Sequence, residues 1–448
     1  MSLHDIPSSA AEAATASSTH EIPHNELKAA QVMGFTVRLH RPGPMVRAAV
    51  EFVVAVNAFR PLSRRGYLSF MVFAMGWRAS EVPHLFVAMS VIDVVRRGRR
   101  GDFAGRRGTA ALGLTALSWA ILAVVYRRAV TSRPQLMEPL REELGADYPD
   151  ALARHLVSSS WSARPSVLRT AFVRRRYVEK GSVVRYGPYG RANLADVWRR
   201  ADLPRDGKAP VVVQVPGGAW VLGWRRPQAY PLMDHLADRG WICVSLNYRV
   251  SPLHTWPDHL VDVKRALAWV KENIGLFGGD PDFVAITGGS AGGHLAALAA
   301  LTPNDPTLQP GFEDYDTSVV AAVSMYGRYD WVSTRGKGRR EFIAFLQKFV
   351  VKKPIRTRRD VYVDASPIRL VRPDAPPFFV VHGQDDSIIP VGEAREFIAA
   401  MRAVSTSPVV YAELPHTQHG FDMMDSPRGH YAADAVCQFL AWVYGTRR

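Results

Sequence analysis

The sequence predicts an α/β fold with a mostly parallel central sheet and flanking helices, preceded by a helical N-terminal region. Three features predict this: apolar strands such as 211–215, helical segments between most later strands, and a charge-free run of 19 residues at 108–126. An apolar run without alternation suits a strand that is buried on both faces of a sheet. Strands that alternate with helices indicate parallel pairing with crossover helices. With 448 residues, the chain has room for such a domain and a second region.

The composition restricts the classes of function. Apolar residues make up 47% of the chain, and the net charge of +15 comes mostly from arginine. Such a charge suits a nucleic acid, an anionic membrane surface or the codon bias of a GC-rich genome. Because neither a zinc pattern nor a basic motif interleaved with aromatic residues is present, we expect no nucleic-acid partner. Cys243 and Cys437 fall in a predicted strand and a predicted helix, where we expect them to be small buried hydrophobic residues.

The N-terminal third is predicted to be associated with a membrane. Residues 1–37 lack apolar periodicity and are predicted to be a disordered tail, and they do not resemble a secretory signal. Residues 38–133 are predicted to be helical and membrane-associated, with 108–126 as the best transmembrane candidate. That run would extend for roughly 28 Å, close to the thickness of a bilayer core. Residues 67–77 and 85–92 are also apolar. The alternative is a buried core helix of the same length.

The distribution of arginine predicts the orientation. Residues 96–107 contain six arginines, which is typical of a cytoplasmic loop and would place the catalytic domain on the extracytoplasmic side. Arg127, Arg128 and Arg133 on the other side of 108–126 reduce this asymmetry. Residues 134–164 are predicted to form a helical linker or cap, with a helix over 136–156.

Residues 165–448 are predicted to be the catalytic domain, with a lid insertion at about 327–366. The predicted strands are Ala171–Tyr177, Leu194–Arg199, Pro210–Val215, Ile242–Tyr248, Phe283–Ile286, Val319–Tyr326, Phe378–His382 and Val409–Leu414. Helices are predicted near 227–239, 258–275, 291–301, 391–403 and 428–443. In the basic lid, Glu341–Val351 is predicted to be an amphipathic helix that either rests on anionic lipid or forms a solvated cap.

One serine stands among glycines between a predicted strand and a predicted helix, in Thr287-Gly-Gly-Ser-Ala-Gly-Gly-His294. A sharp strand-to-helix turn lifts Ser290 above the sheet and requires small residues at Gly288 and Gly292. The positive end of the following helix would face a developing oxyanion. The alternative is a glycine-rich turn with an inert serine.

A second glycine-rich loop, Val215-Pro-Gly-Gly-Ala-Trp220, follows an earlier apolar strand. Its backbone N–H groups can point at the substrate of the serine. We expect Gly218 and Ala219 to donate to the oxyanion together with Ala291. Trp220 either lines the substrate pocket or packs in the core.

An acid and a base follow two later strands. Asp386 comes after the strand at 378–382 and is preferred over Asp385, while His419 follows the last strand and is preferred over His416. A carboxylate can fix the tautomer of a histidine that takes the proton of a serine. The three residues occur in the order serine, aspartate, histidine, each at a strand end. This order argues strongly against the hypothesis that Ser290 is inert.

Together these motifs resemble the α/β-hydrolase esterases of the hormone-sensitive-lipase-like group, and among them actinobacterial Lip-type carboxylesterases. The matching segments are Gly217-Gly-Ala-Trp220, Asn247-Tyr-Arg-Val-Ser-Pro252, Gly278-Gly-Asp-Pro281, Gly288-Gly-Ser-Ala-Gly-Gly-His294, His382-Gly-Gln-Asp-Asp386 and His419-Gly-Phe421. The resemblance implies an α/β-hydrolase fold and a triad of Ser290, Asp386 and His419. One departure concerns the oxyanion loop, where the family has histidine and this chain has Pro216. The sequence therefore leaves the geometry of that loop undetermined.

These features predict a membrane-associated serine carboxylesterase that forms an acyl-enzyme with short- to medium-chain acyl or lipid esters. We expect no metal or organic cofactor; Asp280 and Asp282 are expected to form a turn, without a third ligand. His382 and His294 are expected to be structural. Two alternatives stay open: an acyltransferase with the same triad, and a catalytically silent, membrane-anchored binding domain.

Overall fold

The computed structural model describes residues 42–64, 66–153, 156, 172–179, 181–333 and 338–447. The predicted tail 1–37 lies outside these residues, as do parts of the predicted linker 134–164 and of the predicted lid 327–366. Residues from Pro44 onward form one compact unit.

The described residues form an eight-stranded sheet with the order β1-β2-β4-β3-β5-β6-β7-β8. The pairs β1–β2 and β2–β4 are antiparallel, and every other pair is parallel. The prediction of a mostly parallel sheet that starts with antiparallel strands is thus confirmed. The strands are β1 (Val183–Arg185), β2 (Leu194–Trp198), β3 (Ala209–Val215), β4 (Ile242–Leu246), β5 (Gly279–Gly289), β6 (Ala322–Met325), β7 (Phe378–Gly383) and β8 (Val409–Leu414).

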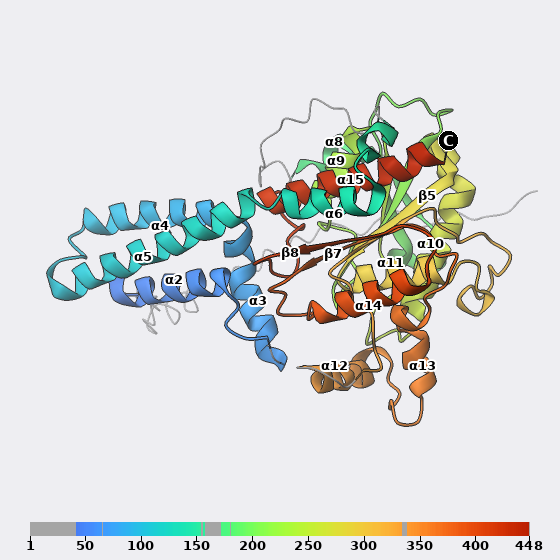
Figure 1. The fold of residues 1–448 in the computed structure, drawn as a ribbon. Helices are drawn as coiled ribbons and strands as arrows, with labels where there is room; N and C mark the ends of the chain where they lie inside the picture. The colour runs from blue at the N-terminus through green and yellow to red at the C-terminus, as the bar shows by residue number, and fades with distance from the viewer. Residues whose placement is uncertain are drawn as a thin grey trace, which may run out of the picture. The chain divides into compact units, whose positions relative to one another are not determined.

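Helices cover both faces of this sheet (Figure 1). On β3, Val211 and Val213 belong to one core cluster and Val212 belongs to another, so that successive side chains are buried on opposite faces. The first cluster includes residues of α10 (Asp258–Asn273), α11 (Ala291–Leu301) and α14 (Gly392–Val404). The second includes residues of α6 (Pro134–Leu144), α9 (Tyr230–Asp238) and α15 (Pro427–Thr446).

The start of the catalytic domain differs from the prediction. The segment 171–177 was expected to be a strand, but Arg174–Tyr177 forms a short helix, α8. Val173 and Tyr177 are buried four residues apart, which is the spacing of one helix face, while Arg175 and Arg176 between them are exposed. The short edge strand β1 was not predicted.

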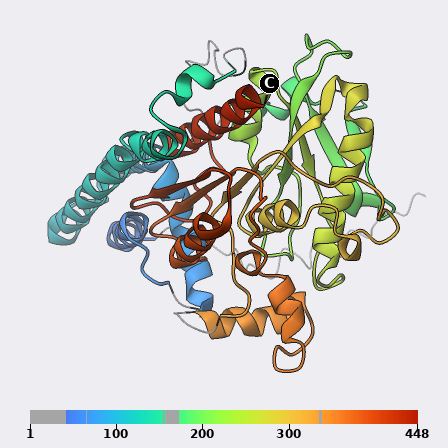
Figure 2. The same cartoon turned by 45° about the vertical axis from the view of Figure 1, so that its right-hand side comes forward.

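The lid contains two helices, α12 (Arg339–Phe345) and α13 (Arg359–Asp364). A π-helical turn, Leu346–Val350, continues α12. Ile343, Leu346 and Val350 are buried, so the predicted amphipathic helix at 341–351 is present, with a π-helical second half. In both ribbon views α12 lies beside the first turn of α3 (Gly66–Glu81) (Figure 1, Figure 2).

In the described part of the N-terminal region, four helices precede the linker: α2 (Pro44–Phe59), α3, α4 (Pro83–Gly98) and α5 (Gly105–Val130). Helices α2 and α4 pack against α5 and extend with it away from the sheet, whereas α3 lies next to the catalytic domain (Figure 1). Within the described ranges, one helical segment, Gly105–Leu144, is long and apolar enough to cross a membrane, and 33% of its apolar window is buried. The predicted helix at 136–156 ends at Leu144, since Gly145 has φ 93° and a 3₁₀ turn, Tyr148–Ala151, follows it.

Candidate active site

Ser290 occupies the sharp turn between β5 and α11. Its backbone has φ 58° and ψ −122°, a conformation that costs a non-glycine residue roughly 1–3 kcal/mol. The turn is closely packed, since a Cβ at Gly288 would lie 2.4 Å from backbone atoms of Gly292, and a Cβ at Gly292 would lie 2.1 Å from the Val215 oxygen. The Ser290 N–H donates to the Met325 oxygen on β6 (2.9 Å). This strained turn raises the serine above the sheet, as a nucleophile requires.

Asp386 follows β7 and is almost completely buried. One of its carboxylate oxygens accepts the N–H groups of Ile388 (2.8 Å) and Ile389 (2.7 Å), and the other lies 2.6 Å from Nδ1 of His419. Burial opposes ionisation, but the charge of His419 and hydrogen bonds from His382 and His419 outweigh it and hold the pKa of Asp386 well below its ordinary value. The carboxylate is therefore ionised at neutral pH and orients the imidazole ring.

His419 follows β8, and its ring is held by aromatic neighbours. The ring centroid of Tyr326 lies 4.5 Å from that of His419, and the centroid of Phe73 lies 5.7 Å away in an edge-on arrangement. The side-chain oxygen of Gln418 accepts the N–H groups of Ser387 and His419, both at 2.8 Å. Gln418 thus joins the loop of the acid to the loop of the base, a connection that the sequence analysis missed.

The alternative acid, Asp385, and the alternative base, His416, lie near each other and are separate from the pair of Asp386 and His419. His416 is exposed, with its Nδ1 3.7 Å from a carboxylate oxygen of Asp385. His382 is completely buried, with its Nε2 3.0 Å from the Ile389 oxygen and 3.3 Å from Asp386. The structure therefore pairs His419 with Asp386, and His382 supports the acid loop as expected.

The expected oxyanion loop lies directly against the serine turn. A Cβ at Gly217 would lie 3.2 Å from Cβ of Ser290, and Gly218 and Ala219 have φ of 129° and 52°. In the described part of the chain, the N–H groups of Gly218 and Ala219 donate no hydrogen bond. The N–H of Ala291 begins α11, so the helix offers it no acceptor. Three donors are thus available near Ser290.

Gln228 fixes this loop at the position next to Pro216. Its side-chain oxygen accepts the Gly217 N–H (2.7 Å), and its side-chain nitrogen donates to the Gly217 carbonyl (3.2 Å). The Tyr248 hydroxyl donates to the Pro216 carbonyl (3.0 Å). These bonds hold the backbone in a chain that lacks the family's histidine. Sequence analysis did not identify Gln228, which stands 11 residues after Gly217.

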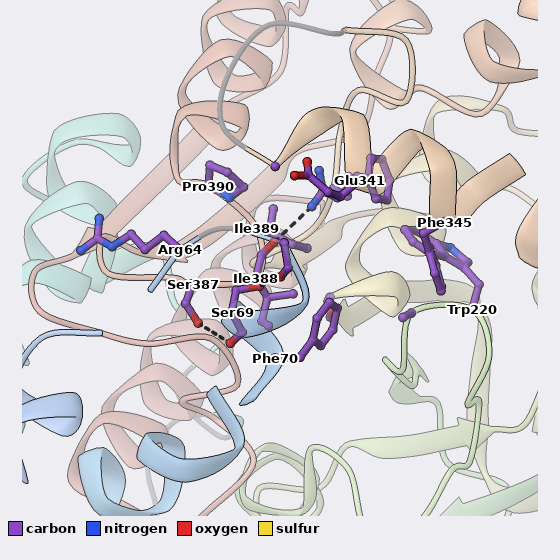
Figure 3. Close-up of a pocket in the computed structure, with 16 residues that line it drawn as sticks. Arg64, Ser69, Phe70, Trp220, Glu341, Phe345, Ser387, Ile388, Ile389 and Pro390 are labelled. Carbon is purple, nitrogen blue, oxygen red and sulfur yellow. Dashed lines mark hydrogen bonds between the residues drawn. The ribbon is translucent and has the colours of Figure 1, made fainter. Parts of the chain in front are cut away.

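An apolar cavity opens beside Ser290 (Figure 3). Trp220 lines it, and the same indole is buried and donates to Nδ1 of His294 (3.2 Å). Burial lowers the pKa of His294 to about 3, and its ring stacks on Trp331, which confirms a packing role. Other lining residues include Ser69, Phe70, Ala219, Phe342, Phe345, Ile388 and Ile389, and the charged residues Arg64, Arg328 and Glu341 also line the cavity.

Two arginines beside the cavity share one carboxylate. Arg328 lines the cavity, and its guanidinium and that of Arg339 both donate to the same oxygen of Glu393 at 2.6 Å. Arg328 also lies 3.7 Å above the ring of Phe342 and donates to the Ile388 carbonyl (3.2 Å). This cluster fixes the lid helix α12 against the loop of the acid, and the sequence analysis missed it.

Helix α3 reaches the same site, although the sequence analysis grouped residues 67–77 with the membrane region. The Trp77 indole donates to the Gly420 carbonyl (2.8 Å), and Arg64, just before the helix, forms an ion pair with Asp385. Phe70 lines the cavity together with Ser290.

Among the described residues, no group of three or more His, Cys, Asp or Glu side chains is arranged to hold a metal ion. Asp280 and Asp282 lie in strand β5 rather than in the predicted turn, and the turn-like feature there is the hydrogen bond from the N–H of Asp282 to the Asp280 carboxylate (3.1 Å).

Comparisons with known proteins agree with this geometry. Residues 201–401 match the protein family BD-FAE. The probable carboxylic ester hydrolase LipM of Mycobacterium tuberculosis is 47% identical over 415 residues, which covers 90% of this chain and 94% of LipM. The esterase LipQ of the same organism is 44% identical, with 84% of this chain and 86% of LipQ covered.

A solved structure supports the fold alone. A truncated carbohydrate esterase from gut microbiota superposes with a TM-score of 0.51 at 21% identity, covering 61% of this chain and 98% of that chain. The match to LipM is longer than the catalytic domain and therefore includes much of the N-terminal region. With this extent of identity, the chain belongs to the Lip-type carboxylesterase family of α/β-hydrolases.

Proposed function

We propose that Ser290, His419 and Asp386 carry out the carboxylic-ester hydrolysis of this family. The proposal rests on the 2.6 Å contact between Nδ1 of His419 and buried Asp386, together with the strained strand-to-helix turn that holds Ser290. Asp386 accepts a hydrogen bond from the Nδ1–H group of His419, which keeps the proton on Nδ1 and leaves Nε2 free to act as a base.

The reaction then proceeds in two halves. Nε2 of His419 takes the proton of Ser290 as the hydroxyl oxygen attacks the ester carbonyl carbon, and the N–H groups of Gly218, Ala219 and Ala291 stabilise the resulting oxyanion. The imidazolium returns the proton to the departing alkoxide, which leaves an acyl-enzyme. Water, deprotonated by His419, attacks the acyl carbonyl and releases the acid and free Ser290.

Labelling with a fluorophosphonate tests this assignment. Peptide mass mapping should find the phosphonyl group on Ser290, and Ser290→Ala and His419→Ala should each abolish labelling. His416→Ala is the matched control and should label at the wild-type rate. Folded wild-type protein that does not label would remove Ser290 from the mechanism and favour a silent binding domain.

The apolar cavity supports a substrate with an acyl chain of short to medium length. Its walls include Phe70, Phe342 and Phe345, which offer no charge to an acyl group. We assign the acyl side of the ester to this cavity.

The helices α2, α4 and α5 support action at a lipid bilayer. On α5, the buried positions recur every three or four residues, and most of them are small; they are Gly108, Ala111, Thr115, Ser118, Leu122, Val125 and Ala129. Large apolar side chains point outward instead. We call these exposed residues the bundle surface: Met45, Val46, Val50, Val53, Leu85, Met89, Val91, Ile92, Val95, Leu112, Leu117 and Val124. Small residues between helices and large apolar residues outside are typical of helices that pack in lipid.

Two arginines of the bundle form ion pairs within it. Arg47 contacts Glu51 and Asp93, and Arg97 contacts Asp93 (2.8 Å). The arginine-rich turn between α4 and α5 lies at the end of the bundle away from the sheet (Figure 1). If this turn is cytoplasmic, the catalytic domain lies on the extracytoplasmic side. Protease added outside intact spheroplasts should then cleave the catalytic domain, and protection until lysis would reverse the orientation.

A further inference from the structure

Helix α3 contacts the loops of both the acid and the base, although it belongs to the N-terminal helices. We propose that Trp77 and Phe73 of α3 are positioning residues that set the orientation of His419, so that the N-terminal helices complete the active site. This inference rests on the proposed triad. It assigns a catalytic contribution to a part of the chain that contains none of the triad residues.

The contacts to the base loop are direct. The Trp77 indole donates to the carbonyl of Gly420, the residue after His419, at 2.8 Å. The Phe73 ring meets the His419 ring edge-on, with 5.7 Å between centroids and 82° between planes. Gly420 has φ 70°, and a Cβ there would lie 3.5 Å from the Trp77 indole nitrogen and 3.6 Å from the Phe73 ring. The backbone of the base loop therefore lies close against α3.

The His419 ring is confined by three groups from different parts of the chain. Asp386 binds Nδ1, Tyr326 packs at 4.5 Å between centroids, and Phe73 supplies the third contact. A general base must hold Nε2 within hydrogen-bond reach of the serine proton. Removing the contribution of α3 leaves the ring with Asp386 and Tyr326 alone, which permits rotations that move Nε2 away from Ser290.

The contacts to the acid loop come from the N-terminal end of the same helix. Arg64 forms an ion pair with Asp385, next to Asp386, and the Ser387 hydroxyl donates to the Ser69 carbonyl (3.4 Å) (Figure 3). Helix α3 thus bridges the two loops that hold the acid and the base.

The C-terminal end of α3 is anchored in the catalytic domain. Glu81 is completely buried and forms an ion pair with Arg428 of α15 (3.0 Å), and it also accepts a hydrogen bond from Ser426 (2.8 Å). Because a buried charge is stable only when it is paired, this contact fixes the position of Trp77, one turn earlier on the helix.

Trp77→Phe in the full chain tests the proposal, because it removes the indole donor and keeps an aromatic ring. We expect kcat for a soluble short-chain ester to fall about 3- to 10-fold, in line with the loss of one hydrogen bond, while KM changes less than about twofold. The rate of Ser290 phosphonylation should fall by a similar factor. Trp269→Phe on α10, which makes the same chemical change far from the site, is the matched control and should leave both rates unchanged.

A purely structural role for Trp77 would give a different result. Trp77→Phe would then lower the melting temperature, while labelling per folded molecule stayed at the wild-type rate, and the proposal would be overturned. If Trp77→Phe does not fold, Phe73→Leu decides by the same rates, because it removes the edge contact and nearly conserves volume. Absence of labelling in the wild-type protein would contradict the triad itself, which separates the two failures.

Discussion

At the scale of single residues, Gln228 shows how the oxyanion loop is held where the family has a histidine and this chain has Pro216. The two groups of its side-chain amide bind the N–H and the carbonyl of Gly217, which fixes the backbone directly before the expected oxyanion donors Gly218 and Ala219. Oxyanion stabilisation depends on donors that are oriented before the reaction begins. The conformation of this loop therefore depends on a side chain that touches no reacting atom.

We expect Gln228→Ala to lower kcat about tenfold with little change in KM. The loss is smaller than the hundredfold or more that follows removal of a direct oxyanion donor, because Gln228 acts through the backbone of Gly217. Steady-state kinetics with a short-chain ester measures the effect. Gln384→Ala removes a similar amide from an exposed position and should match the wild type; a Gln228→Ala variant that also matches the wild type would contradict this role.

The motifs of the triad were visible in the sequence because each consists of neighbouring residues at a strand end. Ser290 stands between glycines, and Asp386 and His419 each follow an apolar run. Gln418 and Gln228 lie close to these motifs, but glutamine is common in turns and its partner cannot be identified from spacing. Trp77 could not be assigned at all, since its partner Gly420 is 343 residues away in the chain.

At the scale of elements, strand β2 fixes the segment that leads from the oxyanion loop to Gln228. Asp196 on β2 is buried and contacts three arginines: Arg174 of α8 (2.7 Å), and Arg225 (2.8 Å) and Arg226 (2.5 Å), which precede Gln228. Burial opposes ionisation, yet hydrogen bonds from these arginines lower the pKa of Asp196 to about 2. The same cluster explains why 174–177 is not a strand: α8 presents Arg174 to β2.

We expect Asp196 to stabilise the protein in a pH-dependent way. Its pKa is lower in the folded chain, about 2, than the ordinary value of 3.8, so its contribution is complete above pH about 4 and is lost as the pH falls through 2. The shift corresponds to about 2 kcal/mol of free energy of unfolding.

Urea unfolding of wild type and Asp196→Asn between neutral pH and about pH 2 measures this contribution. The destabilisation of the variant should be largest at neutral pH and shrink at the acidic end. Asp360→Asn, which alters a fully exposed ion pair with Arg358, is the matched control and should show no measurable change. A destabilisation that is constant with pH would mean that the charge of Asp196 is not its source.

We expect the lid helix α12 to limit the length of the acyl chain that the cavity accepts. Phe342 lines the cavity beneath the guanidinium of Arg328. Because added space favours longer apolar groups, Phe342→Ala should raise the ratio of kcat/KM for octanoate over butyrate esters by about fivefold or more. Phe349→Ala removes a phenyl ring from the same lid at a position that does not line the cavity, and it should leave the ratio unchanged. An unchanged ratio in Phe342→Ala would place the acyl chain elsewhere.

At the scale of the whole molecule, the bundle surface and the active site belong to one continuous set of helices. Helix α3 connects α2 to α4 and carries Phe70 into the cavity. The sequence analysis recognised the apolar character of these helices, and it placed the transmembrane candidate 108–126 inside α5. It did not separate α3 from its neighbours, because hydropathy records how apolar a segment is and not whether lipid or protein covers it.

A charge placed on the bundle surface should weaken binding to lipid. Met89 and Ile92 on α4 are 58% and 51% exposed, and Ile92→Glu should lower partitioning into anionic vesicles more than tenfold, since a carboxylate is costly in a bilayer core. Flotation with phosphatidylglycerol vesicles measures this, and hydrolysis of a soluble ester should be unaffected. Leu253→Glu, at an 88% exposed position of the catalytic domain, is the matched control. Equal flotation of both variants would contradict lipid contact by α4.

The ion pair between Glu81 and Arg428 has a consequence for how the enzyme can be divided. A fragment that begins after the N-terminal helices would retain Arg428 inside the protein without its carboxylate, and removing one partner of a buried pair costs about 3–5 kcal/mol. That loss is a large fraction of the stability of an ordinary domain. We therefore expect the hydrolase half not to fold on its own, because a buried arginine in its interior is neutralised by a carboxylate that the N-terminal helices supply.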